Sequence, residues 1–216
     1  MNKNAFDTLI SQKPSTKSGL WLIIFLFICS ACQTANQKTN NWSIYKADSK
    51  SSSYSSLKQV NKANVHQLEL AWSFRFKDAL PGARTSRSQA NPIVIDGLMY
   101  IPSSRNRIYA INSITGEQVW SFDPFSGAQG GGVSRGVTYW EDGKDKRILF
   151  TAGSNLFALD ALSGKLISEF GTNGKVNLNA GMRGDPDKIS VVPSSPGIVY
   201  KDLYILGTAV SELYGA

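Results

Sequence analysis

Cysteine, histidine and charge are all scarce in this chain of 216 residues. Both cysteines, Cys29 and Cys32, lie near the N-terminus, so the rest of the chain excludes disulfides and thiolate metal sites. The one histidine, His66, lies in a polar stretch and is interpreted as a surface residue rather than a ligand. Charged residues make up only 18 % of the chain, and the net charge of +7 is scattered without a basic run, which gives no indication of nucleic-acid binding.

Two common catalytic signatures are also missing. The glycine-rich stretch at residues 130–136 lacks the Lys-Ser/Thr pair of a phosphate-binding loop and does not fit a dinucleotide fingerprint. No Gly-x-Ser-x-Gly elbow is present, so a hydrolase of that type has no support.

The N-terminus has the pattern of a targeting segment. Two lysines, Lys13 and Lys17, precede an apolar run at residues 20–28 and then small residues, which predicts a signal peptide over residues 1–32. The run is too short to span a bilayer comfortably. Because Ser30-Ala31-Cys32 resembles a bacterial lipoprotein cleavage site, we expect a lipid anchor at Cys32 on the periplasmic side of a membrane. The polar residues 33–41 predict a flexible tether.

What the chain does contain is an internal repeat. The stretch IYAINSITGEQVWSF at residues 108–122 returns as LFALDALSGKLISEF at residues 156–170, an offset of 48 positions (156 minus 108). Around it, short apolar runs alternate with turn signals such as Asp96-Gly97, which favours a tight hairpin. The predicted strands are residues 70–74, 92–95, 98–101, 107–111, 118–122, 137–140, 147–150, 156–159, 166–170, 196–200 and 203–206.

This pattern predicts an all-β fold made of β-propeller blades, each of four antiparallel strands. A single four-stranded sheet cannot bury both of its faces, whereas blades stacked around an axis cover them. An immunoglobulin-like sandwich has similar strands but does not explain the repeat. Residues 42–216 hold about two complete blades with pieces at each end, so we expect them to be the N-terminal, incomplete part of a longer propeller.

One copy of the repeat carries a family motif. The pattern Ala110-x-Asn112-x-x-x-Gly116-x-x-x-Trp120 resembles the tryptophan-docking motif of pyrroloquinoline quinone (PQQ) dehydrogenases, whose catalytic domain is an eight-bladed propeller. There the indole of one blade docks against the Ala and Gly positions of its neighbour. The second copy has Ser168 at the tryptophan position, which predicts weaker docking.

Other stretches extend the resemblance. Residues 42–72 are similar to the family's opening segment, except that Lys46-Ala47 stands where the family has Gly-Gly. The motif at residues 134–140, SRGVTYW, matches the family closely, and residues 170–178 resemble the membrane-type glucose dehydrogenase branch.

The resemblance implies a site for PQQ and Ca²⁺. PQQ is a planar tricarboxylate, so it needs cationic and hydroxyl donors, and a hard cation needs carboxylate oxygen. The resemblance implies one metal ligand, Glu212, and the cofactor-binding residues Arg135, Ser194, Gln89, Thr208 and Ala209. The loop at residues 127–133 has neither the adjacent cysteines nor the histidine that the family often lays against PQQ, and the catalytic base is expected beyond Ala216.

The implied function of the full-length protein is a periplasmic PQQ-dependent dehydrogenase. It would oxidise a sugar or alcohol and pass the electrons to a respiratory quinone or cytochrome, while residues 1–216 alone are expected to be inactive. The alternative is a non-enzymatic propeller lipoprotein that acts as an outer-membrane assembly scaffold. Arg135, Ser194 and Glu212 favour the enzyme, because a scaffold needs no cofactor-binding side chains.

Overall fold

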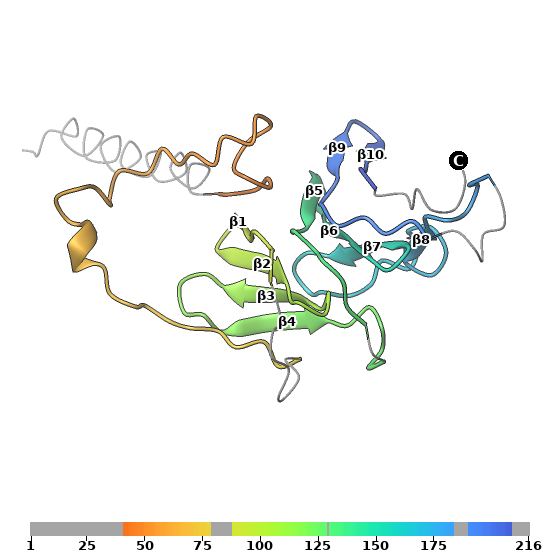
Figure 1. Cartoon of the computed structure of the whole chain (residues 1–216), viewed down its shortest axis with the longest axis horizontal. Helices are drawn as coiled ribbons and strands as arrows, with labels where there is room; N and C mark the ends of the chain where they lie inside the picture. Colours follow the sequence, from red (N-terminus) through yellow and green to blue (C-terminus); the bar gives the residue numbers. More distant parts are fainter. Residues whose placement is uncertain (1–40, 79–87, 129, 184–189, 209–216) are drawn as a thin grey trace, which may run out of the picture. The chain divides into compact units, whose positions relative to one another are not determined.

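The computed structural model describes residues 41–78, 88–128, 130–183 and 190–208 (Figure 1). Contacts divide the chain into Met1–Thr39 and Asn40–Ala216, and the first unit, with the predicted signal peptide, lies outside the described residues. The described part of the second unit contains ten β-strands and one short 3₁₀ helix, η2 (Val65–Gln67). Within these residues no helix has the length and hydropathy that a membrane span requires.

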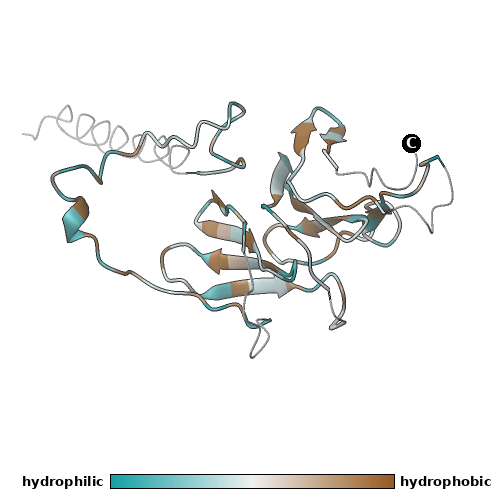
Figure 2. Cartoon of the chain, viewed as in Figure 1, coloured by the Kyte–Doolittle hydropathy of each residue, from teal (hydrophilic) through white to brown (hydrophobic). Residues whose placement is uncertain are grey.

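The first sheet is a four-stranded antiparallel meander in the order β1-β2-β3-β4. Its strands are β1 (Ile93–Ile95), β2 (Leu98–Pro102), β3 (Ile108–Asn112) and β4 (Gln118–Phe122). The hairpin predicted at Asp96-Gly97 is confirmed, since Ile95 pairs with Leu98 and the two turn residues have φ of +50° and +82°. Hydrophobic residues gather on the strands of this sheet (Figure 2).

The second sheet repeats the meander in the order β5-β6-β7-β8. Its strands are β5 (Thr138–Asp142), β6 (Asp145–Ala152), β7 (Asn155–Asp160) and β8 (Lys175–Asn177). A hairpin of β9 (Ile198–Tyr200) and β10 (Leu203–Ile205) follows, as the sequence predicts for the start of a third unit. The all-β fold of antiparallel four-stranded sheets is confirmed.

The fourth strand of the second sheet differs from the prediction. Residues 166–170 were expected to form one strand, but only Leu166 bridges to Leu159, and the chain then leaves the sheet until β8 begins at Lys175. Three residues of this excursion, Gly171, Asn173 and Gly174, have positive φ, and an Asn-Gly turn brings the chain back. The copy at residues 118–122 has no such turn residues and stays a continuous strand.

The strand predicted at residues 70–74 is not paired with a described strand. Its side chains nevertheless alternate, with Trp72, Phe74 and Phe76 turned inward and their neighbours exposed. The rings of Phe74 and Phe76 pack edge-on or tilted against Tyr109 of β3, at centroid distances of 5.5 and 5.1 Å. This segment therefore covers the first sheet in an extended, strand-like conformation.

Two tryptophans dock between neighbouring units in the same way. The indole Nε1–H of Trp120 donates to the Ala161 carbonyl at 3.0 Å, and that of Trp72 donates to the Ser113 carbonyl at 3.2 Å. Each ring lies on a glycine, because a Cβ on Gly164 would be 2.5 Å from Trp120 Cδ2 and one on Gly116 would be 2.6 Å from Trp72 Cδ2. The docking inferred from the motif is confirmed.

The main core lies between the two sheets. It joins buried residues of the first sheet to those of the second: Ile93, Ile95, Tyr100, Ile108, Ala110 and Trp120 with Ile148, Phe150, Phe157 and Leu159. Tyr100 Oη–H donates to the Ala161 carbonyl at 3.1 Å, beside the indole of Trp120, and burial raises the pKa of Tyr100 above its ordinary value. The tyrosine therefore stays a neutral donor inside the core.

A smaller core covers the other face of the second sheet. Leu149, Leu156 and Ala158 are buried there, with Phe170, Val199 and Tyr204 packed against them. The hairpin thus stands against the second sheet on the face opposite the main core, as expected when successive sheets stack face to face.

Candidate cofactor-binding site

The predicted site residues stand in the segments that lead into the first strand of each unit. Gln89 precedes β1, Arg135 precedes β5 and Ser194 precedes β9. Pro92 precedes β1 and Pro196 precedes β9, and a proline favours an extended conformation in the residue before it, whereas Gly136 stands between Arg135 and β5. Each of three successive units therefore carries one predicted site residue in its entry segment.

Backbone hydrogen bonds tie these entry segments together. The Asn91 N–H donates to the Arg135 carbonyl at 2.9 Å, and the Arg135 N–H donates to the Ser194 carbonyl at 2.8 Å. Gly136 allows the close approach, because a Cβ there would lie 3.1 Å from the Asn91 carbonyl oxygen and its φ is +155°. The segments from three units consequently form one hydrogen-bonded row.

The structure brings Arg135 and Ser194 together. Arg135 Nη1 donates to Ser194 Oγ, and both side chains are half-buried. The planar guanidinium has five N–H donors, so this single bond leaves others for a ligand. A guanidinium beside a hydroxyl can bind a carboxylate, which matches the chemistry of PQQ.

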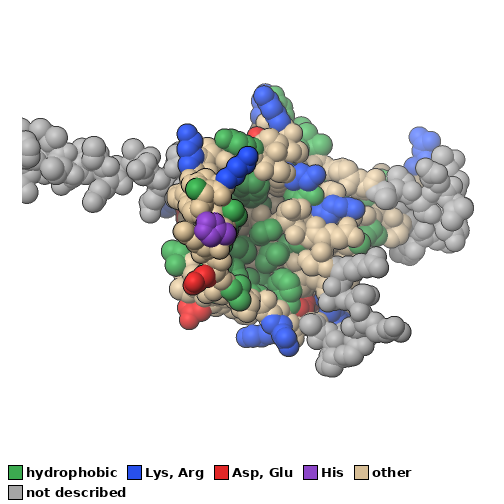
Figure 3. Space-filling view, turned by 60° about the vertical axis from the view of Figure 1, so that its left-hand side comes forward, with side chains coloured by type: hydrophobic (Ala, Val, Ile, Leu, Met, Phe, Trp, Pro, Cys, Tyr) green, Lys and Arg blue, Asp and Glu red, His purple; other side chains and the backbone are tan. Residues whose placement is uncertain are grey.

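The remaining predicted residues are not joined to this pair. Gln89 is exposed two residues before Asn91, and Thr208 is exposed at the end of the described residues. Ala209 and Glu212 lie outside the described residues. In the described ranges no cluster of three or more His, Cys, Asp and Glu could hold a metal ion, and His66 is exposed at the surface as predicted (Figure 3).

A hydrogen-bonded turn at residues 123–127 leads into the glycine-rich loop before Arg135. The carboxylate of Asp123 accepts the N–H groups of Phe125 and Gly127, both at 3.0 Å, and pairs with Arg107. Burial alone would raise the pKa of Asp123, but these hydrogen bonds and the guanidinium hold it below its usual range. An ionised Asp123 therefore holds this turn at neutral pH.

The same loop relies on an aromatic ring. A Cβ on Gly130 would fall 1.9 Å from Phe125 Cδ2, so the ring lies directly on the glycine backbone. Gly132 in turn approaches Asn106, a residue only 5 % exposed whose Oδ1 has no partner among the described residues. Ring packing on glycine thus supports the loop here, where the family often has adjacent cysteines or a histidine.

Sequence reasoning missed three contributors. Asn91 links the entry segments, Phe125 supports the loop, and Trp72 docks as Trp120 does. For Trp72 the signal was present, because it precedes Trp120 by the same 48 positions as the repeat (120 minus 72). Asn91 acts through its backbone, so its side-chain type carried no signal.

The sheets and their docking tryptophans define the class of protein as a β-propeller assembled from repeated blades. Residues 42–215 match the family model described as the glucose/ethanol/alcohol dehydrogenase β-propeller domain of PQQ enzymes. The chain therefore belongs to the PQQ dehydrogenase β-propeller family.

Individual relatives agree with this assignment. A quinohemoprotein alcohol dehydrogenase from Comamonas testosteroni is 36 % identical over 134 residues, which is 59 % of this chain and 18 % of that protein. A quinoprotein glucose dehydrogenase from Gluconobacter oxydans is 28 % identical over 199 residues, which is 82 % of this chain and 24 % of that protein. Because both alcohol and glucose enzymes match, the glucose dehydrogenase branch stays a prediction.

Solved structures give the same result. The crystal structure of the Comamonas testosteroni quinohemoprotein alcohol dehydrogenase superposes with a TM-score of 0.60 at 27 % identity, covering 82 % of this chain and 24 % of that one. A europium-containing methanol dehydrogenase superposes with a TM-score of 0.57 at 26 % identity, covering 79 % of this chain and 27 % of that one. The chain thus spans about a quarter or less of the length of these relatives.

Proposed function

We propose that the full-length protein is a PQQ-dependent dehydrogenase that oxidises a sugar or an alcohol on the periplasmic side of a bacterial membrane. The observation that carries this proposal is the Arg135–Ser194 pair, held by the row of entry segments within a chain of this family. A non-enzymatic scaffold would need the tryptophan docking but has no use for a half-buried guanidinium beside a hydroxyl, with N–H groups that bond nothing else among the described residues.

The residues of this chain would bind and orient the cofactor. Arg135 would donate to a cofactor carboxylate, and Ser194 would hold the guanidinium in place while offering its own hydroxyl. Glu212 is proposed as a carboxylate ligand of Ca²⁺, with Gln89, Thr208 and Ala209 beside the cofactor. PQQ, when bound, supplies a two-electron acceptor for the substrate, which loses two electrons and two protons as its C–OH becomes C=O. We propose a respiratory quinone or cytochrome as the final acceptor.

The test is reconstitution of the full-length protein with PQQ and Ca²⁺. Dye-linked oxidation of glucose and a panel of alcohols would be measured, together with PQQ affinity by equilibrium dialysis. We expect Arg135→Ala to weaken PQQ binding at least tenfold, consistent with about 1.5–3 kcal/mol for a charged hydrogen bond. Arg75→Ala, which removes an exposed guanidinium, is the control and should bind normally. No turnover on any substrate would favour the scaffold, and unchanged PQQ binding by Arg135→Ala would refute the site.

The lipid anchor needs its own experiment. We propose that Cys32 is lipidated, with residues 33–41 as the tether. Cells that express the full-length protein should incorporate labelled palmitate into it, and Cys32→Ser should abolish the label whereas Cys29→Ser retains it. Labelling of the Cys32→Ser protein would contradict the assignment.

A further inference from the structure

A polar pocket of about 160 Å³ lies at one end of the first sheet. Its wall is formed by the end of the extended segment at residues 70–78, the loop from β2 to β3 and the turn that follows β4. Five charged side chains and one aromatic ring line it: Lys77, Asp78, Arg105, Arg107, Asp123 and Phe125. The other lining residues are glycines and an alanine of the loop at residues 127–130, so charged groups dominate the wall.

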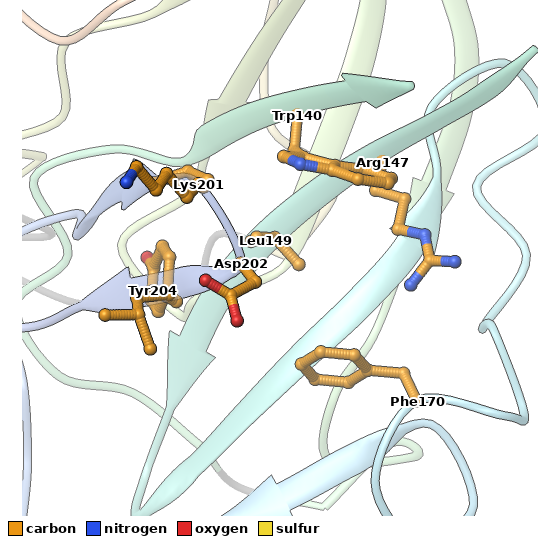
Figure 4. A pocket seen from close by; sticks show the side chains of 9 residues that line it. Trp140, Arg147, Leu149, Phe170, Lys201, Asp202 and Tyr204 are labelled. Carbon is orange, nitrogen blue, oxygen red and sulfur yellow. The ribbon is translucent and has the colours of Figure 1, made fainter. Parts of the chain in front are cut away.

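This pocket belongs to a unit whose four strands are all described. It differs in this respect from the hollow beside the β9–β10 hairpin, which is lined by Trp140, Phe170 and Tyr204 among others (Figure 4). Only two strands of that third unit are described, and nothing in the structure shows what covers the hollow. The pocket at the first sheet is instead bounded by a complete sheet, its loops and the segment packed on it.

The pocket lies at the same end of the first sheet as the entry segments but is separate from the Arg135–Ser194 pair. In the antiparallel meander, β2 and β4 both return to the end where β1 begins, so the β2–β3 loop and the turn after β4 stand there. The chain then continues from Asp123 to Arg135. Neither Arg135 nor Ser194 lines the pocket, so a ligand in it would be additional to the cofactor.

The charges of the wall are nearly balanced. Arg107 forms an ion pair with Asp123. Asp78 accepts a hydrogen bond from the Ser103 hydroxyl and another from the Tyr109 hydroxyl, the latter at 3.4 Å. Three cations and two carboxylates leave a net charge of +1, so a cation or a polyanion would lie against groups of its own sign. A neutral polar molecule avoids this repulsion.

The same groups keep free hydrogen-bonding capacity. The hydrogen bond to Asp123 and, to a smaller extent, the Tyr109 hydroxyl raise the pKa of Arg107. Its Nε is nevertheless buried without a hydrogen-bond partner in the described ranges. Asp78 accepts one bond at each carboxylate oxygen, and each oxygen has a second lone pair. Donors and acceptors therefore stand side by side, and a hydroxyl group can satisfy both kinds.

We propose that this pocket binds a neutral polyhydroxylated ring, a monosaccharide or a cyclic polyol. Its hydroxyls accept from the guanidinium groups of Arg105 and Arg107 and donate to the carboxylate of Asp78, while its C–H groups contact the ring of Phe125. The pocket is smaller than the roughly 300–1,000 Å³ that drug-sized ligands occupy, so it accepts a single ring. This binding does not require the cofactor.

Calorimetric titration of the full-length protein without PQQ tests the proposal. Glucose and myo-inositol should each bind saturably, whereas cyclohexanol, a ring of the same size with one hydroxyl, should bind at least tenfold more weakly because it makes fewer hydrogen bonds. Inorganic phosphate should bind no more tightly than cyclohexanol. No saturable binding of either polyol would overturn the proposal, and phosphate binding tighter than glucose would show an anion site instead. Because PQQ is absent, either failure leaves the dehydrogenase proposal standing.

Matched variants check the location. Arg105→Ala and Lys77→Ala each remove a donor from the wall and should weaken glucose binding about fivefold to tenfold, the loss of one hydrogen bond. Arg75→Ala removes an exposed cation of the same extended segment outside the pocket and should leave binding within twofold. If Arg105→Ala does not fold, as judged by circular dichroism, Lys77→Ala decides the question. Equal affinities for Arg75→Ala and the folded pocket variants would place glucose elsewhere and refute the pocket.

Discussion

Two interfaces of this protein are built from aligned positions of one repeat, yet they differ in packing. The first lies between the first and second sheets, and the second lies between the second sheet and the β9–β10 hairpin. At the first, Trp120 and Tyr100 both donate to the Ala161 carbonyl and their rings lie 5.9 Å apart. At the second, Ser168 and Leu149 occupy these positions, so neither of these two rings is present, and Phe170, Val199 and Tyr204 pack around Leu149 instead.

The difference shows that strand pairing within a sheet and ring docking between sheets depend on different residues of the repeat. Strand pairing is retained in both sheets, since the β2–β3 and β6–β7 pairs have equivalent registers around Ala110 and Ala158. Ring docking is not retained. The meander therefore depends on backbone pairing and on buried aliphatic residues, whereas docking stabilises one particular junction.

The largest loss of stability is expected when the docking of Trp120 is removed from the first interface. Trp120→Ala deletes a side chain only 8 % exposed together with its hydrogen bond, and should lower the free energy of unfolding by about 3–5 kcal/mol. Urea unfolding of the full-length protein measures it. Val119→Ala, at a side chain 50 % exposed in the same strand, is the control and should change stability little. Equal losses for the two variants would show that docking contributes nothing.

A second prediction concerns the glycine under the ring. Gly164→Ala should cost about 3 kcal/mol, because φ is +70° and the new Cβ would meet the indole of Trp120. Gly153→Ala shares a positive φ of +55° but has open space around its Cβ, so it should cost only about 1 kcal/mol. Thermal unfolding of both variants compares them. A smaller loss for Gly164→Ala than for Gly153→Ala would contradict the close packing.

A third prediction uses an ion pair that joins the first two sheets. Lys146 Nζ lies 3.0 Å from Asp96 Oδ2, and this hydrogen bond lowers the pKa of Asp96. Because the folded pKa is depressed, the stabilisation is present above the unfolded value of about 4 and is lost as the pH falls through the folded value.

The variant that tests this ion pair is Asp96→Asn, because asparagine removes the charge but tolerates the φ of +50° in this turn. It should lower stability by only about 0.5 kcal/mol at pH 7, since the Asp96 side chain is 59 % exposed. The deficit should vanish near pH 2 when urea unfolding is followed against pH. Asp142→Asn in the exposed end of β5 is the control, and a deficit that persists at pH 2 would exclude the ion pair as its cause.

A change in stability as small as that of Asp96→Asn, but of opposite sign, is expected away from both interfaces, in the opening segment. Ala47 has a φ of +82° where the family has glycine, so Ala47→Gly should relieve strain and raise stability by about 0.5 kcal/mol. Ala63→Gly, at a position without positive φ, should instead lower it. Thermal unfolding of both variants gives the signs, and the same sign for both would refute the strain.

Much of the fold could be predicted from the sequence because the signals were local. The Asp96-Gly97 hairpin and the two strand sets follow from alternating apolar runs between turn residues. The break in the fourth strand of the second sheet could not be predicted from the apolar pattern, since residues 166–170 align with a true strand. Its cause lies just beyond, where Asn173-Gly174 supplies a return turn.

The candidate site was predictable only in part. Arg135 and Ser194 were found through the family motif, and their hydrogen bond confirms that they lie together. The row that holds them depends on backbone groups of Asn91, Arg135 and Ser194, which no residue pattern specifies. Long-range backbone pairing of this kind follows from how the sheets stack, so it appears only in the folded protein.

The row of entry segments has a consequence for how such a site can evolve. Gln89 and Ser194 each stand four residues before the first strand of their unit (93 minus 89 and 198 minus 194), and Arg135 stands three before its own (138 minus 135). None of the three residues lies within a strand ladder, so their side chains can change without disturbing the strand pairing. An amide, a guanidinium and a hydroxyl therefore stand in the entry segments of three successive units, so a repeated and nearly symmetric scaffold carries an asymmetric set of donors.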